Sequence, residues 1–423
     1  MTSALAMGGL VVSCGYQAPT QQRAPTSNVN FRAFVSQDVS LGPSTAFPGG
    51  VPAGLFVIDA SHDLRAAAFV STSNLPGLLV LAPNRKLTLA YSSADNSVAI
   101  VNNATESSSG AVTLPGPTES IAISSDASTA YAAVNNAPVF GQSPGAVEVM
   151  NLNAGNIPVT IPVPSAHYLA ESHNGNRLLV FSDNSDTATV IATSNVRACT
   201  PLCQSPNVIS TISGFDRPVG ALFSSDDNMA YVLNCGPECG GQTASVQAVD
   251  MTTQTLLGPA LPVDAATIGL INGNTLYVAG TPPTAPANAC TGAATAATVC
   301  GRLDVVNLSS MTVTSSQVIT DGYHNRIDLS DNGQLFIGAR NCTNINNGAE
   351  VRGCLSIFNT INPAVVIPPD NNDVTGMQAI KGRNVMYVVE NGELRIYDTT
   401  TDKLGPTQID ISGQAIDVKL VDF

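Results

Sequence analysis

Tryptophan is missing from this sequence, and charged side chains are scarce. The 423 residues include no Trp, and only 11% are Asp, Glu, Lys or Arg, compared with about a quarter in an average soluble domain. Only 17 Lys and Arg residues stand against 31 Asp and Glu, which gives a formal net charge of −14. Because no stretch is rich in cations, the sequence argues against a nucleic-acid partner. Aromatic residues, at 5%, are too few to favour a sugar-stacking platform.

Long apolar runs are also missing, since no segment reaches the roughly 20 apolar residues of a transmembrane helix. The shorter apolar run at 5–12 leads into Val-Val-Ser-Cys at 11–14, which resembles a bacterial lipobox. No Lys or Arg precedes this run, although a secretion signal normally begins with basic residues. A frayed N-terminus with a free thiol is therefore the alternative. We predict a signal segment over 1–14, with lipid attachment at Cys14 as the only link to a membrane, and a Pro-rich flexible tether over 15–29.

Nine cysteines support the assignment of Cys14, because an odd number leaves one cysteine without an intramolecular partner. The other eight form neighbouring pairs, each around a loop that contains Gly, Pro or Asn, and we expect four disulfides and an oxidising compartment. A zinc site made by the first two pairs is the alternative, although it would leave two pairs unexplained. The predicted disulfide pairs are Cys199 with Cys203, Cys235 with Cys239, Cys290 with Cys300, and Cys342 with Cys354.

A short phrase recurs along the chain as SSDASTAY at 124–131, SSDDNMAY at 224–231 and LSDNGQLF at 329–336. Each copy is a polar turn between an apolar alternating run and an aromatic residue that opens the next run. Repetition of one supersecondary unit at this period is typical of a solenoid or a propeller. Strands of four to seven residues with no convincing amphipathic helix favour an all-β propeller with four-stranded antiparallel blades.

The strand pattern predicts eight blades in a single domain over 30–423, with seven as the alternative if one N-terminal strand is miscounted. One blade should consist of strands at 120–124, 130–135, 147–152 and 159–163. The C-terminal strand at 415–421 lacks a blade, whereas three N-terminal strands at 31–36, 55–60 and 65–71 lack an inner strand. We therefore expect the C-terminal strand to pair with the N-terminal three and close the ring. Inner strands recur near Leu78, Ile121, Tyr168, Val219, Ile268, Ile327 and Met377.

The phrase resembles the YVTN-type β-propeller repeat of bacterial and archaeal surface proteins, and the resemblance extends over almost all of 31–423. The second strand of that repeat is matched best by YVLN at 231–234, YVAG at 277–280 and YVVE at 387–390. The turns at 172–175 and 272–274 depart from it, since neither has the Ser-Asp pair in full. The resemblance implies a surface adhesin or surface-layer component. Related propellers include lactonases and quinoprotein enzymes, but the latter hold their cofactor with Trp motifs that this chain lacks.

Loop lengths distinguish the two faces of the predicted ring. In a propeller, the loops that join second and third strands lie on the same face as the blade-to-blade connections. Three of the predicted disulfides and the long loops at 41–52 and 136–145 belong to this face, whereas the loops at 93–96 and 391–392 are minimal. We expect a disulfide-stiffened wall over three consecutive blades, with the Cys199–Cys203 pair on the opposite face. Stiff loops on a rigid scaffold are common binding sites, and tolerated insertions are the alternative.

No catalytic or metal-binding set emerges from the four histidines or from the sequence motifs. His324 precedes an inner strand and could face the channel together with Asp321 and Asp328, where a metal or acid–base role is conceivable. Acidic clusters at 183–186, 226–227 and 370–373 could bind Ca²⁺, but Asp and Asn also favour turns by bonding the backbone locally. We therefore predict no cofactor, with Ca²⁺ as the alternative.

Together these observations favour a secreted or lipid-anchored cell-surface propeller that binds or scaffolds another protein, or assembles with copies of itself. A non-enzymatic role is favoured. The alternative is a metal-dependent hydrolase or lactonase that acts at the channel mouth.

Overall fold

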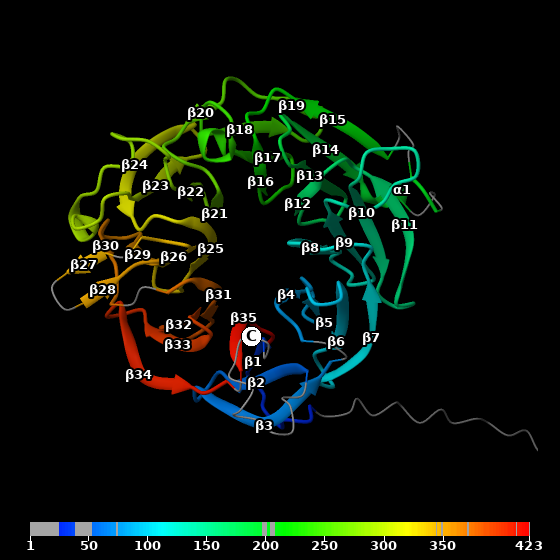
Figure 1. The fold of residues 1–423 in the computed structure, drawn as a ribbon, viewed down its shortest axis with the longest axis horizontal. Helices are drawn as coiled ribbons and strands as arrows, with labels where there is room; N and C mark the ends of the chain where they lie inside the picture. Colours follow the sequence, from blue (N-terminus) through cyan, green and yellow to red (C-terminus); the bar gives the residue numbers. More distant parts are fainter. Residues whose placement is uncertain are drawn as a thin grey trace, which may run out of the picture.

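The computed structural model describes residues 25–38, 53–72, 75–196, 201–203, 208–343, 345–347, 350–369, 372–411 and 413–422. Within these ranges the strands form eight antiparallel blades around a central channel (Figure 1). The predicted all-β propeller is confirmed, with eight blades rather than seven. No helix in the described part of the chain is long and apolar enough to cross a membrane.

The blades are numbered along the chain, and the strands of each blade are given in order from the channel to the outer edge. Blade 1 contains β35 (Gln414–Leu420), β1 (Arg32–Asp38), β2 (Gly54–Asp59) and β3 (Leu64–Ser71). Blade 2 contains β4 (Leu78–Leu81), β5 (Leu87–Ser92), β6 (Ser97–Asn102) and β7 (Ser107–Thr113). Blade 3 contains β8 (Ser120–Ile123), β9 (Thr129–Val134), β10 (Ala146–Asn151) and β11 (Asn156–Pro162). Blade 4 contains β12 (Ala166–Glu171), β13 (Arg177–Ser182), β14 (Thr187–Ala192) and β15 (Ile209–Ser213), with the short helix α1 (Thr193–Val196) after β14.

Blades 5 to 8 follow the same plan with longer loops. Blade 5 contains β16 (Pro218–Phe223), β17 (Met229–Asn234), β18 (Ser245–Asp250) and an outer edge divided into β19 (Thr255–Leu256) and β20 (Leu261–Pro262). Blade 6 contains β21 (Ile268–Asn272), β22 (Thr275–Gly280), β23 (Gly301–Asn307) and β24 (Thr312–Ile319). Blade 7 contains β25 (Tyr323–Leu329), β26 (Gln334–Arg340), β29 (Leu355–Asn359) and β30 (Val365–Val366), plus the hairpin β27 (Ile345–Asn347) and β28 (Glu350–Arg352). Blade 8 contains β31 (Val374–Ile380), β32 (Val385–Glu390), β33 (Glu393–Asp398) and β34 (Lys403–Ile409). The 3₁₀ helices η1 (Gly236–Cys239) and η2 (Gly292–Ala294) lie in loops.

The two ends of the described chain meet in blade 1, as predicted. Strand β35 pairs antiparallel with β1, with Ala33 opposite Leu420 and Val35 opposite Val418. In Figure 1 the last strand lies beside the first at the inner edge of the ring. An ion pair of 2.6 Å between Arg32 Nε and Asp422 Oδ2 reinforces this junction. The pairing removes both open strand edges, which would otherwise invite aggregation.

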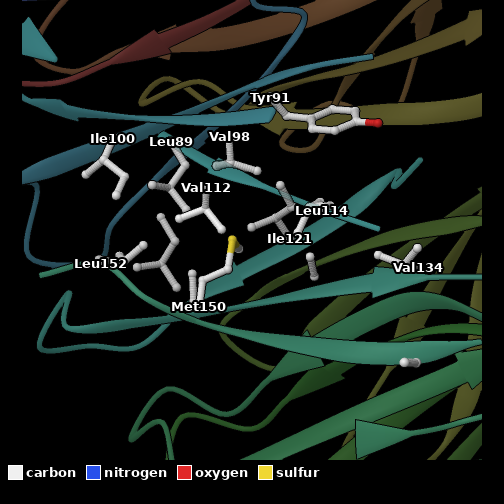
Figure 2. Close-up of a cluster of buried hydrophobic side chains, with 14 of the residues drawn as sticks. Leu89, Tyr91, Val98, Ile100, Val112, Leu114, Ile121, Val134, Met150 and Leu152 are labelled. Atoms are coloured by element: carbon white, nitrogen blue, oxygen red, sulfur yellow. The ribbon is translucent and has the colours of Figure 1, made fainter. Parts of the chain in front are cut away.

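Apolar side chains pack between neighbouring blades rather than within one central core. Figure 2 shows the layer between blades 2 and 3, where Leu89 and Ile100 face Ile121 and Met150. Because the second and third strands of each blade are buried on both faces, they are nearly continuous apolar runs, such as TAYAAV in β9. Every blade therefore depends on its neighbours for burial.

The recurrent Ser-x-Asp phrase has a common hydrogen-bond pattern. In blade 3, Ser124 Oγ donates to Asp126 Oδ1 at 2.7 Å and accepts from the Thr129 amide at 3.1 Å. In blade 4, Asn174 occupies the place of the Asp, and its Oδ1 accepts from Ser172 Oγ at 3.0 Å. The departure seen in the sequence therefore preserves the turn, because Asn offers the same acceptor as Asp.

Three disulfides within the described residues lie on one face, which we call the braced face. They connect Cys235 with Cys239, Cys290 with Cys300, and Cys342 with Cys354, each in the loop between the second and third strands of blades 5, 6 and 7. The predicted wall over three consecutive blades is thus confirmed. The fourth predicted pair is described only at Cys203, which is disulfide-bonded and whose amide donates to Thr160 O in the outer strand of blade 3. Cys199, like Cys14 and the 41–52 loop, lies outside the described residues.

We expect closure of blade 1 to be far more sensitive to truncation than its outer edge. Leu420 on β35 is 1% exposed and Leu64 on β3 is 60% exposed. Leu420→Ala should lower the free energy of unfolding by about 2–5 kcal/mol, because it leaves a cavity in the closing strand. The control Leu64→Ala should change it by less than about 0.5 kcal/mol. Urea unfolding curves would measure both, and similar losses for the two variants would contradict this role of the closing strand.

Candidate functional site

At the channel mouth on the braced face, aromatic, acidic, basic and histidine side chains lie around one cavity. A cavity of about 400 Å³ opens there, a size suited to a small molecule. Most of the blades, excluding blade 8, contribute to its walls, because the inner strands begin at this face. One wall residue from each contributing blade, in order, is Ile416, Leu78, Glu119, Tyr168, Val219, Thr267 and Tyr323.

Two tyrosines reach across the channel mouth toward each other. Tyr168 is near the start of β12 in blade 4, and Tyr323 starts β25 in blade 7, with blades 5 and 6 between them in the ring (Figure 1). Their hydroxyl oxygens are 2.8 Å apart. A second cavity of about 200 Å³ also contacts both tyrosines, so the pair forms part of the wall between the two cavities. Burial raises the pKa of both phenols, which therefore remain protonated hydrogen-bonding groups.

A histidine held between two carboxylates lies beside this tyrosine pair. His167 Nδ1 is 2.6 Å from Asp183 Oδ1, and its Nε2 is 3.5 Å from Glu119 Oε2. Its ring stacks on Tyr168, with the ring centroids 3.9 Å apart. Burial acts to lower the pKa of His167, but the two carboxylates outweigh burial and raise it. The hydrogen bond from His167 in turn lowers the pKa of Glu119.

Of the three residues predicted from the sequence to face the channel, His324 lines the cavity of about 400 Å³, whereas Asp321 and Asp328 do not. His324 is only 1% exposed, and burial lowers its pKa to about 4, so its imidazole is neutral at neutral pH. Asp321 accepts hydrogen bonds from Thr343 N at 2.7 Å and Thr343 Oγ1 at 2.5 Å, which hold the Cys342–Cys354 loop. Asp328 Oδ2 accepts from the Ala379 amide of blade 8 at 2.7 Å. These three residues therefore do not converge on one point, and no group of three or more His, Cys, Asp or Glu in the described residues is arranged to hold a metal ion.

The acidic clusters considered as Ca²⁺ ligands are engaged in local contacts where they are described. Asp226 Oδ1 accepts from Ser224 Oγ at 2.6 Å within its turn. Asp227 Oδ1 lies 2.8 Å from His173 Nδ1, on the face opposite to His167. Asp186 pairs with Arg217 at 3.3 Å. Asp370 lies outside the described residues.

Sequence reasoning missed Glu119, Asp183 and Tyr323 as parts of the site. The available signal was their position, because each lies at the braced-face end of an inner strand or of the strand beside it. Polar or aromatic residues at that end of several repeats should meet around the channel.

Comparisons with known proteins establish the fold and no family. No protein-family model and no curated protein matches the chain. Among solved structures, it is similar to the dihydro-heme d1 dehydrogenase NirN in complex with DHE, with 11% identity and a TM-score of 0.62 over 95% of this chain and 79% of that chain. It is also similar to the periplasmic gluconolactonase PpgL of Pseudomonas aeruginosa, with 13% identity and a TM-score of 0.47 over 92% and 98%. At 11% identity the similarity to NirN shows the propeller fold alone, and the resemblance to YVTN-type repeats stays a prediction.

The pairing of His167 with carboxylates predicts a pH dependence. The pKa of His167 in the folded protein exceeds the unfolded value of about 6.5. The interaction of protonated His167 with Asp183 and Glu119 therefore contributes its full stabilisation below about pH 6.5. This contribution is lost as the pH rises through the folded pKa. Glu119→Gln should lower the pKa of His167, since it removes one of the two charges that oppose burial.

Nuclear magnetic resonance titration of the four histidines would measure this shift directly. Glu393→Gln, which alters an exposed Glu at the start of β33, is the matched control. An unchanged His167 titration in the Glu119 variant would contradict the assignment.

Proposed function

We propose that this protein is an extracytoplasmic binding propeller that contacts a protein partner through its braced face. The observation that carries the proposal is the placement of three disulfides in equivalent loops of three consecutive blades. Disulfides are typical of oxidising compartments. A wall of stiff loops loses little conformational entropy on binding, which favours affinity.

Further contacts hold the braced face in a defined shape. Glu238, inside the Cys235–Cys239 loop, accepts from the Thr281 amide of the next blade at 2.9 Å. Asp216 accepts from Thr243 N at 2.6 Å. On the same face, the blade 3 loop presents the side chain of Phe140, whose relative exposure is 102%. Rigid loops and an exposed aromatic side chain on one face match the composition of protein interfaces.

The binding face can be tested with matched charge insertions. Thr298 is exposed within the Cys290–Cys300 loop, and Thr401 is exposed in the β33–β34 turn on the opposite face. Thr298→Lys should abolish the complex, because a desolvated charge would enter the interface, whereas Thr401→Lys should leave it intact.

Light scattering of the non-reduced protein would first show whether the partner is a second copy. For a different partner, crosslinked complexes isolated from the native envelope would be compared between the two variants. Loss of complex in both variants, or in neither, would contradict binding by the braced face.

We further propose that Cys14 carries a lipid and that residues 15–29 tether a propeller domain of residues 30–423. The lipobox-like segment and the resemblance to surface repeat proteins support this anchoring. The full chain, expressed in a bacterial host that processes lipoproteins, should partition into detergent. Cys14→Ser should move it to the aqueous phase, and equal partitioning of both proteins would contradict lipid attachment.

A further inference from the structure

Two arginines line the channel cavity of a protein that is otherwise poor in cations. Arg326 lies in β25 and Arg340 ends β26, both in blade 7, and both contact the cavity of about 400 Å³. The whole chain has only 17 Lys and Arg residues and a net charge of −14. Burial, followed by the charge of Arg326, lowers the pKa of Arg340. Two guanidinium groups that are partly shielded from water repel each other, and this repulsion costs free energy unless a nearby anion compensates their charge.

Neither arginine has a contact ion pair among the described residues. Arg326 is held by backbone carbonyls, since its Nε donates to Thr375 O at 2.7 Å and its Nη1 to Asn325 O at 2.8 Å. Arg340 Nε is shielded from solvent and has no hydrogen-bond partner in the described structure. An unpaired buried donor is uncommon in folded proteins, and the side chain of Arg340 also lines the cavity.

The carboxylates whose charge acts on Arg340 bind other groups. Asp373 Oδ1 accepts from the Asn341 amide at 2.7 Å. Glu119 pairs with His167, and Asp417 Oδ2 accepts from the Leu79 amide at 3.0 Å. These acids moderate the positive field in the cavity, but none lies within ion-pair distance of Arg340. The guanidinium groups thus keep donors for a ligand.

We infer that the channel mouth binds a small oxyanion, a carboxylate or phosphate group, between Arg326 and Arg340. A planar guanidinium donates two parallel hydrogen bonds to either group. The tyrosine pair lines the same cavity, and the hydroxyl oxygens can still accept hydrogen bonds from polar parts of a ligand. The cavity volume admits a small organic molecule that bears the oxyanion.

Thermal unfolding of the whole protein tests this site with succinate and with inorganic phosphate as probes, at constant ionic strength and with chloride as the reference. We expect at least one probe, at millimolar concentration, to raise the Tm of the wild-type protein. A rise with succinate alone would identify a carboxylate ligand, and a rise with phosphate alone a phosphate ligand. If neither succinate nor phosphate raises the Tm, the inference is overturned.

Substitutions then locate the site. Arg340→Gln should weaken the apparent affinity by about tenfold or more, whereas Arg340→Lys, which keeps the charge but loses the fork, should weaken it less. Lys86→Gln removes one exposed positive charge on the opposite face and should keep the full response. Without a probe, Arg340→Gln should not lower the Tm, because it removes an unpaired charge. A full response in Arg340→Gln would place binding elsewhere and overturn the inference.

Discussion

The antiparallel pairing of β1 with β35 is the constraint on which the ring depends. Each blade buries its apolar faces only against its two neighbours, so an open ring would expose a complete layer at each end. Side chains of the inner strands also connect neighbouring blades, because they accept hydrogen bonds from backbone amides of the next inner strand. Asp328 accepts from Ala379 N at 2.7 Å, Gln378 from Leu420 N at 3.2 Å, and Asp417 from Leu79 N at 3.0 Å. Asp328, which the sequence offered as a channel candidate, thus belongs to a series of side chains that connect blades 7, 8, 1 and 2.

Local patterns were sufficient to predict the architecture. Strand alternation and the Ser-x-Asp turns are encoded within a few residues, so the inner strand near each expected position could be read directly. The complementary terminal strands predicted blade 1 because an unpaired strand at one end matched a missing strand at the other. The turn at 172–175 appeared irregular only because sequence comparison treats Asn and Asp as different, although both supply the acceptor that Ser172 needs.

The site could not be predicted to the same extent, for two physical reasons. Tyr168 and Tyr323 are 155 residues apart, and only the circular arrangement brings their hydroxyls together. In addition, the register of β25 against β26 shifts between His324 and Arg326. Strand side chains alternate with a period of two, so such a shift changes which residues face the channel. The sequence correctly predicted His324 at the channel, but it did not predict the shift, and the neighbouring residues Asn325 and Arg326 also line the cavity.

The tyrosine pair at the channel mouth depends on the closed ring. Its hydrogen bond of 2.8 Å joins blades 4 and 7, which are not neighbours, so its formation requires a fixed separation of those blades. The cation-bearing cavity and the disulfide-braced loops share this face, where the inner strands begin and the blades are joined. A rigid scaffold therefore sets the geometry of both surfaces, and the proposed binding at either would require little reorganisation.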